Sequence, residues 1–125
     1  MGQILRLATF STLLAIDNIV ANRLRLPLIE IRKTDVFAQG LDALRDIQAR
    51  AKVQARIERL AAGNPGDAEP VGEGVSELRI NYGPGYRVYF KPRGRELIIL
   101  LAGGDKSTQA RDIKAALRLA RNLSE

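Results

Sequence analysis

The sequence contains neither cysteine nor histidine. Without cysteine the chain has no disulfide framework, no thiolate nucleophile and no zinc–thiolate site. Without histidine it lacks the side chain that most often acts as a general base near neutral pH and most often binds metals. Any acid–base chemistry must therefore use lysine, arginine, tyrosine, aspartate or glutamate, and we expect neither a metal nor another cofactor.

Phosphate-loop and repeat signals are also missing. The segment Gly72-Glu-Gly74 is not followed by the Gly-Lys-Ser/Thr sequence of a nucleotide-binding loop. No internal repeat or low-complexity tract is present. A nucleotide-binding enzyme of the phosphate-loop class is therefore not predicted.

The first 28 residues differ in composition from the rest of the chain. They are rich in leucine, isoleucine and alanine, but Thr9, Ser11 and Thr12 interrupt the apolar stretch. The pattern suits neither a signal peptide nor a transmembrane helix. We interpret residues 1–28 as an N-terminal extension that is peripheral to function. It is either an amphipathic helix or the result of a start codon placed too far upstream, and the helix would use Leu5, Leu13, Ile16 and Val20.

Residues 29–125 are expected to form a single domain with its own core. The whole chain carries a net charge of +6 and has a sequence pI of 10.2. From Arg79 to Arg95 there are five basic residues and no acidic one, whereas Gly63 to Glu77 contains four acidic residues and no basic one. This reversal of sign predicts a surface with separate acidic and basic regions. The excess of positive charge favours a polyanionic partner.

Alternation and helical spacing predict the order of elements. Residues 28–33 alternate and predict a short strand, and Thr34 or Asp35 caps a helix that begins near Val36. A second helix, capped by Asp46, is expected to run to about Ala62, and the last helix from about Ser107 to Asn122.

A three-stranded antiparallel meander is predicted between these helices. Two alternating runs flank Gly83-Pro-Gly85, and a fully apolar run follows at 97–102. The predicted fold class is therefore α+β, with a short N-terminal strand, a two-helix hairpin, the meander and a C-terminal helix.

Strand alternation separates the residues of the meander into two faces. One face is apolar and is expected to meet the core. The other gathers Arg79, Arg87, Tyr89 and Lys91. It is either an ordinary solvated sheet face or a phosphate-binding surface, and the predominance of arginine, which forms paired hydrogen bonds with phosphate, favours the second.

Four segments of this region together resemble the RelE/ParE toxin superfamily, and most closely its HigB-like addiction module killer branch. They are Glu77-Leu-Arg-Ile80, Gly83-Pro-Gly-Tyr-Arg-Val-Tyr-Phe90, Ile98-Ile-Leu-Leu101 and Gly103-Gly-Asp-Lys-Ser-Thr-Gln109. The resemblance extends over residues 29–123. It implies a RelE-like toxin fold and the toxin half of a bacterial type II toxin–antitoxin pair.

The resemblance also implies roles for individual residues. Arg79, Arg87 and Lys106 match basic residues of the family's site, and Arg87 matches one that stabilises the transition state. Asp112 stands where RelE-like nucleases often carry a tyrosine, so the general acid and base stay open between Lys106 and Tyr89, or Tyr86 if Tyr86 lies outside the core. Tyr89 could instead stack on an RNA base. The residues assigned to RNA binding are Lys91, Arg93, Arg95 and Gln109.

We therefore predict a metal-independent, ribosome-dependent mRNA endoribonuclease that blocks translation in the bacterial cytoplasm. One alternative is a non-enzymatic, ParE-like inhibitor of DNA gyrase. Another is an inactive relative that only binds an antitoxin. The expected partners are an antitoxin encoded in the same operon and mRNA on the ribosome, with operator DNA contacted only through the antitoxin and no membrane involved.

Overall fold

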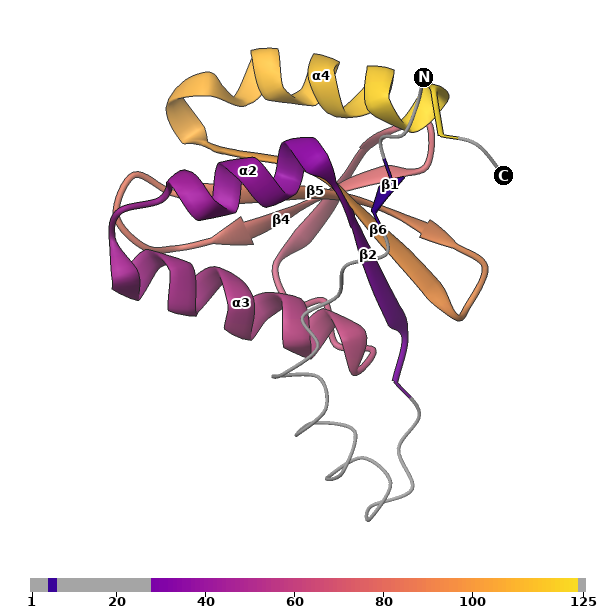
Figure 1. The fold of residues 1–125 in the computed structure, drawn as a ribbon, viewed down its shortest axis with the longest axis horizontal. Helices are drawn as coiled ribbons and strands as arrows, with labels where there is room; N and C mark the ends of the chain where they lie inside the picture. Colours follow the sequence, from indigo (N-terminus) through magenta and orange to yellow (C-terminus); the bar gives the residue numbers. More distant parts are fainter. Residues whose placement is uncertain (1–4, 7–27, 124–125) are drawn as a thin grey trace.

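The computed structural model describes residues 5–6 and 28–123, which form a mixed β-sheet with helices on both faces (Figure 1). The strands are β1 (Leu5–Arg6), β2 (Glu30–Thr34), β3 (Ala68–Gly72), β4 (Val75–Ile80), β5 (Tyr86–Arg93) and β6 (Leu97–Asp105). The helices are α2 (Asp35–Ala43), α3 (Ile47–Ala61), the 3₁₀ turn η1 (Lys106–Thr108) and α4 (Gln109–Arg121). The strand order is β1-β2-β6-β5-β4-β3.

The predicted sheet is wrong. A RelE-like hairpin with a three-stranded antiparallel meander was expected, but the segment β4–β5–β6 is extended by further strands on both sides. On one side β3, expected as a loop, pairs with β4 across a tight turn at which Glu73 and Gly74 both have positive φ angles, 54° and 81°. On the other side β2 pairs in parallel with β6. The α+β class itself is confirmed.

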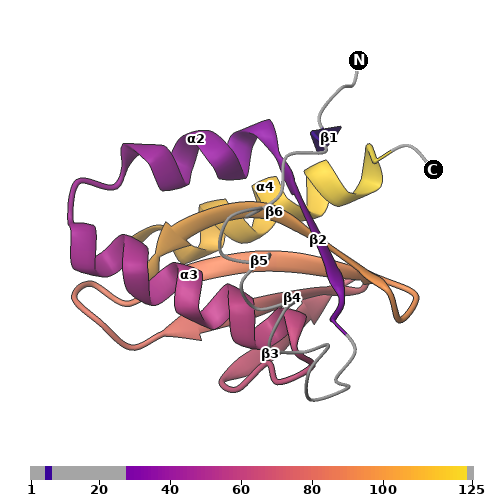
Figure 2. The same cartoon turned by 60° about the horizontal axis from the view of Figure 1, so that its bottom comes forward.

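The parallel pairing follows from the path of the chain. Parallel strands cannot be joined by a tight turn and need a long crossover connection. Here α2 and α3 begin that connection, and the antiparallel β3, β4 and β5 complete it before β6 returns beside β2 (Figure 2). The register aligns Ile31 with Ile98 and Lys33 with Leu100.

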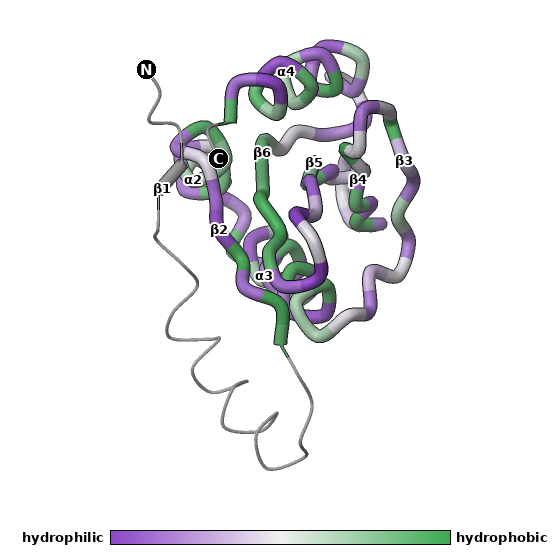
Figure 3. The backbone as a smooth tube through the Cα atoms, turned by 90° about the vertical axis from the view of Figure 1, so that its right-hand side faces the viewer, coloured by the Kyte–Doolittle hydropathy of each residue, from purple (hydrophilic) through white to green (hydrophobic). Residues whose placement is uncertain are grey.

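Both faces of the sheet are buried. Helices α2 and α3 cover one face, where Phe37, Val53 and Ile57 pack against Val88 and Leu100. Helix α4 covers the other, where Ala116 and Ala120 pack against a second apolar cluster. Figure 3 shows β6 coloured as hydrophobic along much of its length, between the helices of the two faces. A strand buried on both faces has no reason to alternate, which explains the continuous apolar run at 97–102.

Two caps fix the helices of the first face. The Thr34 hydroxyl donates to the Leu101 carbonyl of β6 at 2.7 Å and accepts from the Phe37 N–H at 3.1 Å. It therefore joins β2, β6 and the first turn of α2. Asp46 accepts from the N–H groups of Gln48 and Ala49 and caps α3, as predicted.

The boundary between an extension at 1–28 and a domain at 29–125 stays a prediction. The helical assignment of Leu5 is wrong, because Leu5 and Arg6 form the strand β1, which pairs with β2. Leu13, Ile16 and Val20, which were assigned to an amphipathic helix, lie outside the described residues. In the part of the chain that is described, none of the helices has the length and apolar character needed to cross a bilayer.

Candidate functional site

The centre of the candidate site is the carboxylate of Glu77, in the middle of β4. Its residue is only 1% exposed. A carboxylate in such surroundings is costly unless hydrogen bonds and opposite charges compensate it. Four side chains supply that compensation, and they come from three different elements.

Each Glu77 oxygen has two donors. Oε2 accepts from Arg87 Nη1 at 2.7 Å and from Arg79 Nε at 3.1 Å. Oε1 accepts from Gln109 Nε2 at 2.8 Å and from the Tyr89 hydroxyl at 3.1 Å. The carboxylate therefore ties β4 to β5 and to the first turn of α4.

The ionisation of Glu77 depends on these donors. Burial alone would raise the pKa of this carboxyl. The hydrogen bonds and the neighbouring Arg87 charge outweigh burial, so the pKa of Glu77 lies below its ordinary value. The group is thus a permanent anion at neutral pH.

The two arginines of the site are not equivalent. Arg79 and Arg87 are direct register partners on β4 and β5. Arg79 also faces Asp67, with Nη1 3.6 Å from Oδ1, and its side chain is 38% exposed. Arg87 has an 11% exposed side chain and, among the described residues, pairs only with Glu77. The positive charge of Arg79 is thus compensated by two carboxylates, whereas Arg87 has only the Glu77 carboxylate, which it shares with Arg79.

The exposed face predicted around Tyr89 is wrong. Arg79, Arg87, Tyr89 and Lys91 do share one face, but α4 covers much of it and Tyr89 has no exposed surface. Burial and the nearby Glu77 carboxylate raise the pKa of Tyr89 far above its ordinary range. A buried, firmly protonated phenol suits neither base stacking nor the general acid–base role that the sequence suggested.

Lys106 lies at the start of η1, directly after the end of β6. It is exposed, and its Cβ approaches the position a Cβ would take on Gly85, in the turn between β4 and β5. Asp105 caps η1 by accepting from the Ser107 N–H at 2.8 Å. Hydrogen bonds from the Ser107 hydroxyl and N–H lower the pKa of Asp105. Lys106 therefore stands at the rim where β5 begins and β6 ends.

Asp112 occupies the first turn of α4 and is nearly buried. Its carboxylate accepts a short hydrogen bond from the Thr108 hydroxyl and lies 3.7 Å from Arg111 Nε. A methyl group at Gly104 would overlap this carboxylate. Gly104 is the register partner of Arg87, so the absent side chain lets α4 approach β6 closely beside the site.

The residues assigned to RNA binding are not brought together. Gln109 is engaged by Glu77. Lys91, Arg93 and Arg95 lie toward the far end of β5, and six strand residues at about 3.3 Å each separate Arg93 from Arg87 by roughly 20 Å. Arg95 instead lines a second hollow of about 470 Å³ at that end.

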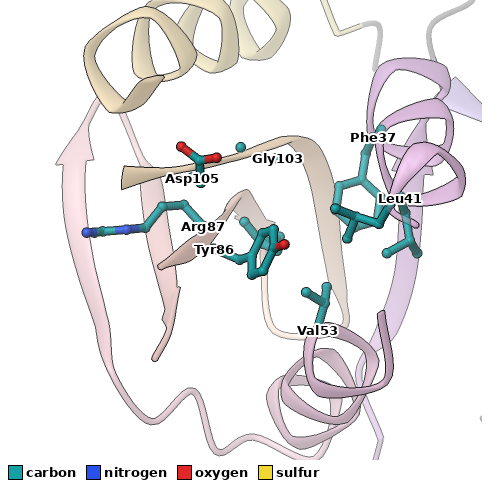
Figure 4. Close-up of a pocket in the computed structure, with 11 residues that line it drawn as sticks. Phe37, Leu41, Val53, Tyr86, Arg87, Gly103 and Asp105 are labelled. Carbon is teal, nitrogen blue, oxygen red and sulfur yellow. The ribbon is translucent and has the colours of Figure 1, made fainter. Parts of the chain in front are cut away.

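An apolar cavity of about 140 Å³ lies on the opposite face of the sheet, between α2, α3 and the end of the β5–β6 pair. Figure 4 shows Phe37, Leu41 and Val53 around it and the Arg87 side chain extending away from it. A side chain at Gly40, which also lines the cavity, would meet nothing within 4 Å. Arg87 is common to both features, because it lines the cavity while its side chain binds the Glu77 carboxylate.

No cluster of three or more His, Cys, Asp or Glu side chains suited to a metal is found within residues 5–6 and 28–123. Glu77 is the site residue that sequence reasoning missed. Alternation already placed it on the face of Arg79, and that pairing was the available signal.

Comparison with known proteins places the chain in a family. Residues 40–125 match the family described as "Phage derived protein Gp49-like (DUF891)". An uncharacterized protein of Haemophilus influenzae is 52% identical over 95 residues, which cover 76% of this chain and 96% of that relative. No solved structure matches the chain. On the family match and this identity, the chain belongs to the Gp49-like family of phage-derived proteins.

Proposed function

We propose that the protein is the toxin of a type II toxin–antitoxin module and cleaves mRNA on the ribosome in the bacterial cytoplasm. Its Gp49-like family is associated with RelE-like toxins, which supports the general role. The observation that carries the finer proposal is the Arg87 guanidinium, held at 2.7 Å by a buried carboxylate near the strand ends where Lys106 is exposed. The net charge of +6 also favours a nucleic-acid partner.

The proposed reaction needs no metal. The 2′ oxygen of one nucleotide attacks the adjacent phosphorus while the bond from phosphorus to the 5′ oxygen breaks. The 2′-OH loses its proton to a base and the 5′ oxygen gains one from an acid, so the products carry a 2′,3′-cyclic phosphate and a 5′-OH. Negative charge builds on the phosphorane oxygens, and fixed cations that meet this charge are usually the largest catalytic contribution.

Arg87 is the proposed phosphorane ligand, because its guanidinium is both oriented and only partly used by Glu77. Arg79 adds positive potential but already shares two carboxylates. Lys106 is proposed as the second cation and as the proton donor to the 5′ oxygen. The ribosome would supply the remaining alignment of the mRNA.

A non-enzymatic, ParE-like inhibitor of DNA gyrase is the second candidate. One observation favours it: Tyr89 is fully buried, and it was the tyrosine predicted for proton transfer. Proton transfer typically contributes about 10²–10⁴-fold, so its loss would weaken a nuclease severely. In this case the positive charges of Arg87 and Lys106 would bind a protein surface rather than mRNA.

In either case we propose that a small antitoxin encoded in the same operon neutralises the protein. Operator DNA would be contacted only through that antitoxin. Co-expression with the neighbouring open reading frame should restore growth, and a failure to do so would contradict this partner.

The test is brief induction of the full chain in bacteria, followed by mapping of mRNA 5′ ends. The wild type should produce cuts inside translated codons. Arg87→Ala should abolish them, and Arg87→Lys, which keeps a cation beside Glu77, should reduce them strongly because lysine lacks the planar fork. Arg118→Ala removes the same charge from an exposed position on α4 and should cut normally. Growth arrest with intact mRNA and induced DNA breaks would instead favour the gyrase candidate.

A further inference from the structure

We propose that Glu77 is a positioning residue for the site: its buried carboxylate fixes the orientation of the Arg87 guanidinium that meets the scissile phosphate. This inference rests on the proposed nuclease function and adds to it a residue that touches no substrate. On this inference the site needs the acidic side chain of Glu77 even though the ligand, an RNA phosphate, is itself an anion.

The burial of Glu77 argues for such a role. The residues beside it on β4 illustrate the contrast, because Val75 and Leu78 fill apolar cores, whereas Glu77 is equally buried but charged. Replacing a buried ion pair by apolar residues is often neutral or stabilising, so stability alone is weak grounds for keeping one. What a buried carboxylate does provide is a fixed hydrogen-bond acceptor.

The geometry of Arg87 shows what is fixed. Its Nη1 binds Glu77 Oε2 at 2.7 Å, the shorter of the two arginine contacts to that oxygen. A guanidinium has five N–H donors, and this contact uses only one nitrogen. The planar group is thereby held in place while Nε and Nη2 have no protein partner among the described residues, which leaves a pair of donors for a phosphate.

Arg79 does not offer the same arrangement. Its Nε is bound to Glu77 and its Nη1 faces Asp67, so carboxylates engage both sides of its guanidinium. Of the two arginines, Arg87 is therefore the one that Glu77 prepares for an external anion.

Gln109 extends the same support to α4. Its amide donates to Glu77 Oε1 at 2.8 Å, and Tyr89 donates to the same oxygen. The carboxylate is thus held from both sides and cannot rotate without losing two hydrogen bonds. A group this constrained can keep Arg87 within the small tolerance that transition-state contacts require.

The test compares single-turnover cleavage of mRNA on programmed ribosomes by three variants. Glu77→Gln keeps the shape but removes the charge, and Glu77→Asp keeps the charge but shortens the reach by one methylene. Both should lower the rate at saturation by about 10²-fold, the typical cost of a misplaced catalytic group, with little change in ribosome binding. Glu73→Gln is the matched control, because Glu73 also binds an arginine, Arg121, but on an exposed surface; its rate should be unchanged.

A double-mutant cycle separates positioning from a general structural effect. In an Arg87→Lys background, Glu77→Gln should cause little further loss of rate, because the group it positions is already gone. Nitrogen-15 NMR of the arginine side chains should show a restrained Arg87 guanidinium in the wild type and a freely rotating one in Glu77→Gln.

The outcomes distinguish this inference from the proposed function. Absence of cleavage by the wild type would overturn the nuclease proposal. Wild-type cleavage with an undiminished rate in either Glu77 variant, or equal losses in both backgrounds of the cycle, would overturn the positioning role alone. If Glu77→Gln fails to fold, Glu77→Asp takes its place, both in the cleavage assay and in the NMR comparison of the Arg87 guanidinium with the wild type.

Discussion

Tyr89→Phe separates the structural role of this tyrosine from the catalytic role that its sequence position suggested. The substitution removes one atom, the hydroxyl oxygen that donates to Glu77 Oε1 at 3.1 Å. The ring keeps its place because the side chain is fully buried and phenylalanine has nearly the same shape. The change therefore tests a single hydrogen bond.

The magnitude follows from the contacts that remain. Oε1 still accepts from Gln109 at 2.8 Å, so this oxygen loses one of its two hydrogen-bond donors and keeps the other. A hydrogen bond to a charged group contributes about 1.5–3 kcal/mol, and we expect a loss of about 2 kcal/mol in the free energy of unfolding. For a domain of this size that loss corresponds to a fall in Tm of roughly 8–16 °C.

Urea unfolding followed by circular dichroism measures this loss. Tyr86→Phe is the matched control, since Tyr86 is half-buried and its hydroxyl has no hydrogen-bond partner within the described residues; its effect should stay within about 0.5 kcal/mol. Per folded molecule, Tyr89→Phe should cleave mRNA within about tenfold of the wild type, whereas loss of a general acid or base would cost about 10²–10⁴-fold. An unchanged stability, or a loss of cleavage beyond about 10²-fold at equal folded protein, would refute the reasoning.

Three further predictions concern pH and packing. Because the pKa of Glu77 is lowered on folding, its stabilisation is present above its ordinary pKa of 4.5 and is lost as pH falls through the folded value; urea unfolding from about pH 7 to about pH 3 should show this loss, and Glu77→Gln should remove that part of it. Gly104→Ala forces a methyl group against Asp112 and should destabilise the fold by about 1–3 kcal/mol in thermal unfolding. Gly40→Ala, in open space on α2, should stabilise it by about 0.5–1 kcal/mol; a destabilised Gly40→Ala would contradict that packing.

The sequence predicted an element well where neighbouring residues alone determine it, as in a helix cap. Asp46 caps α3 because a side-chain carboxylate can reach N–H groups two and three residues later, and this is visible in the sequence. The strand β3 was missed because Ala68-Glu-Pro-Val-Gly72 does not alternate and contains Pro70. Proline is tolerated there because β3 is an edge strand, and edge position is a property of the whole sheet.

The pairing of β2 with β6 had no local signal either. These strands are more than 60 residues apart, and no turn between them defines their register. The continuous apolar run at 97–102 did carry information that was not used. A strand in which apolar and polar residues do not alternate is apolar on both faces and is therefore buried on both. Taken that way, the run predicts a helix over the face of Arg87 and Tyr89.

The sharing of one sheet face was therefore predicted, but the surroundings of that face were not. Alternation correctly placed Arg79, Arg87 and Tyr89 on one face, together with Glu77. The position of α4 over that face turned Tyr89 from an exposed candidate into a buried donor. Which face a helix covers depends on packing across the sheet, and the small residues Ala116 and Ala120 do not specify their partner in advance.

The most direct test of the central claim is analysis of mRNA fragments from ribosomes programmed with a defined codon and incubated with the purified full-length protein. We predict a single cut in the ribosomal A site that leaves a 2′,3′-cyclic phosphate and a 5′-OH, present with the wild type and with Arg118→Ala and absent with Arg87→Ala. Intact mRNA after incubation with folded wild-type protein, or equal cutting by Arg87→Ala, would contradict the assignment of Arg87 as the cation of an RNA-cleaving site.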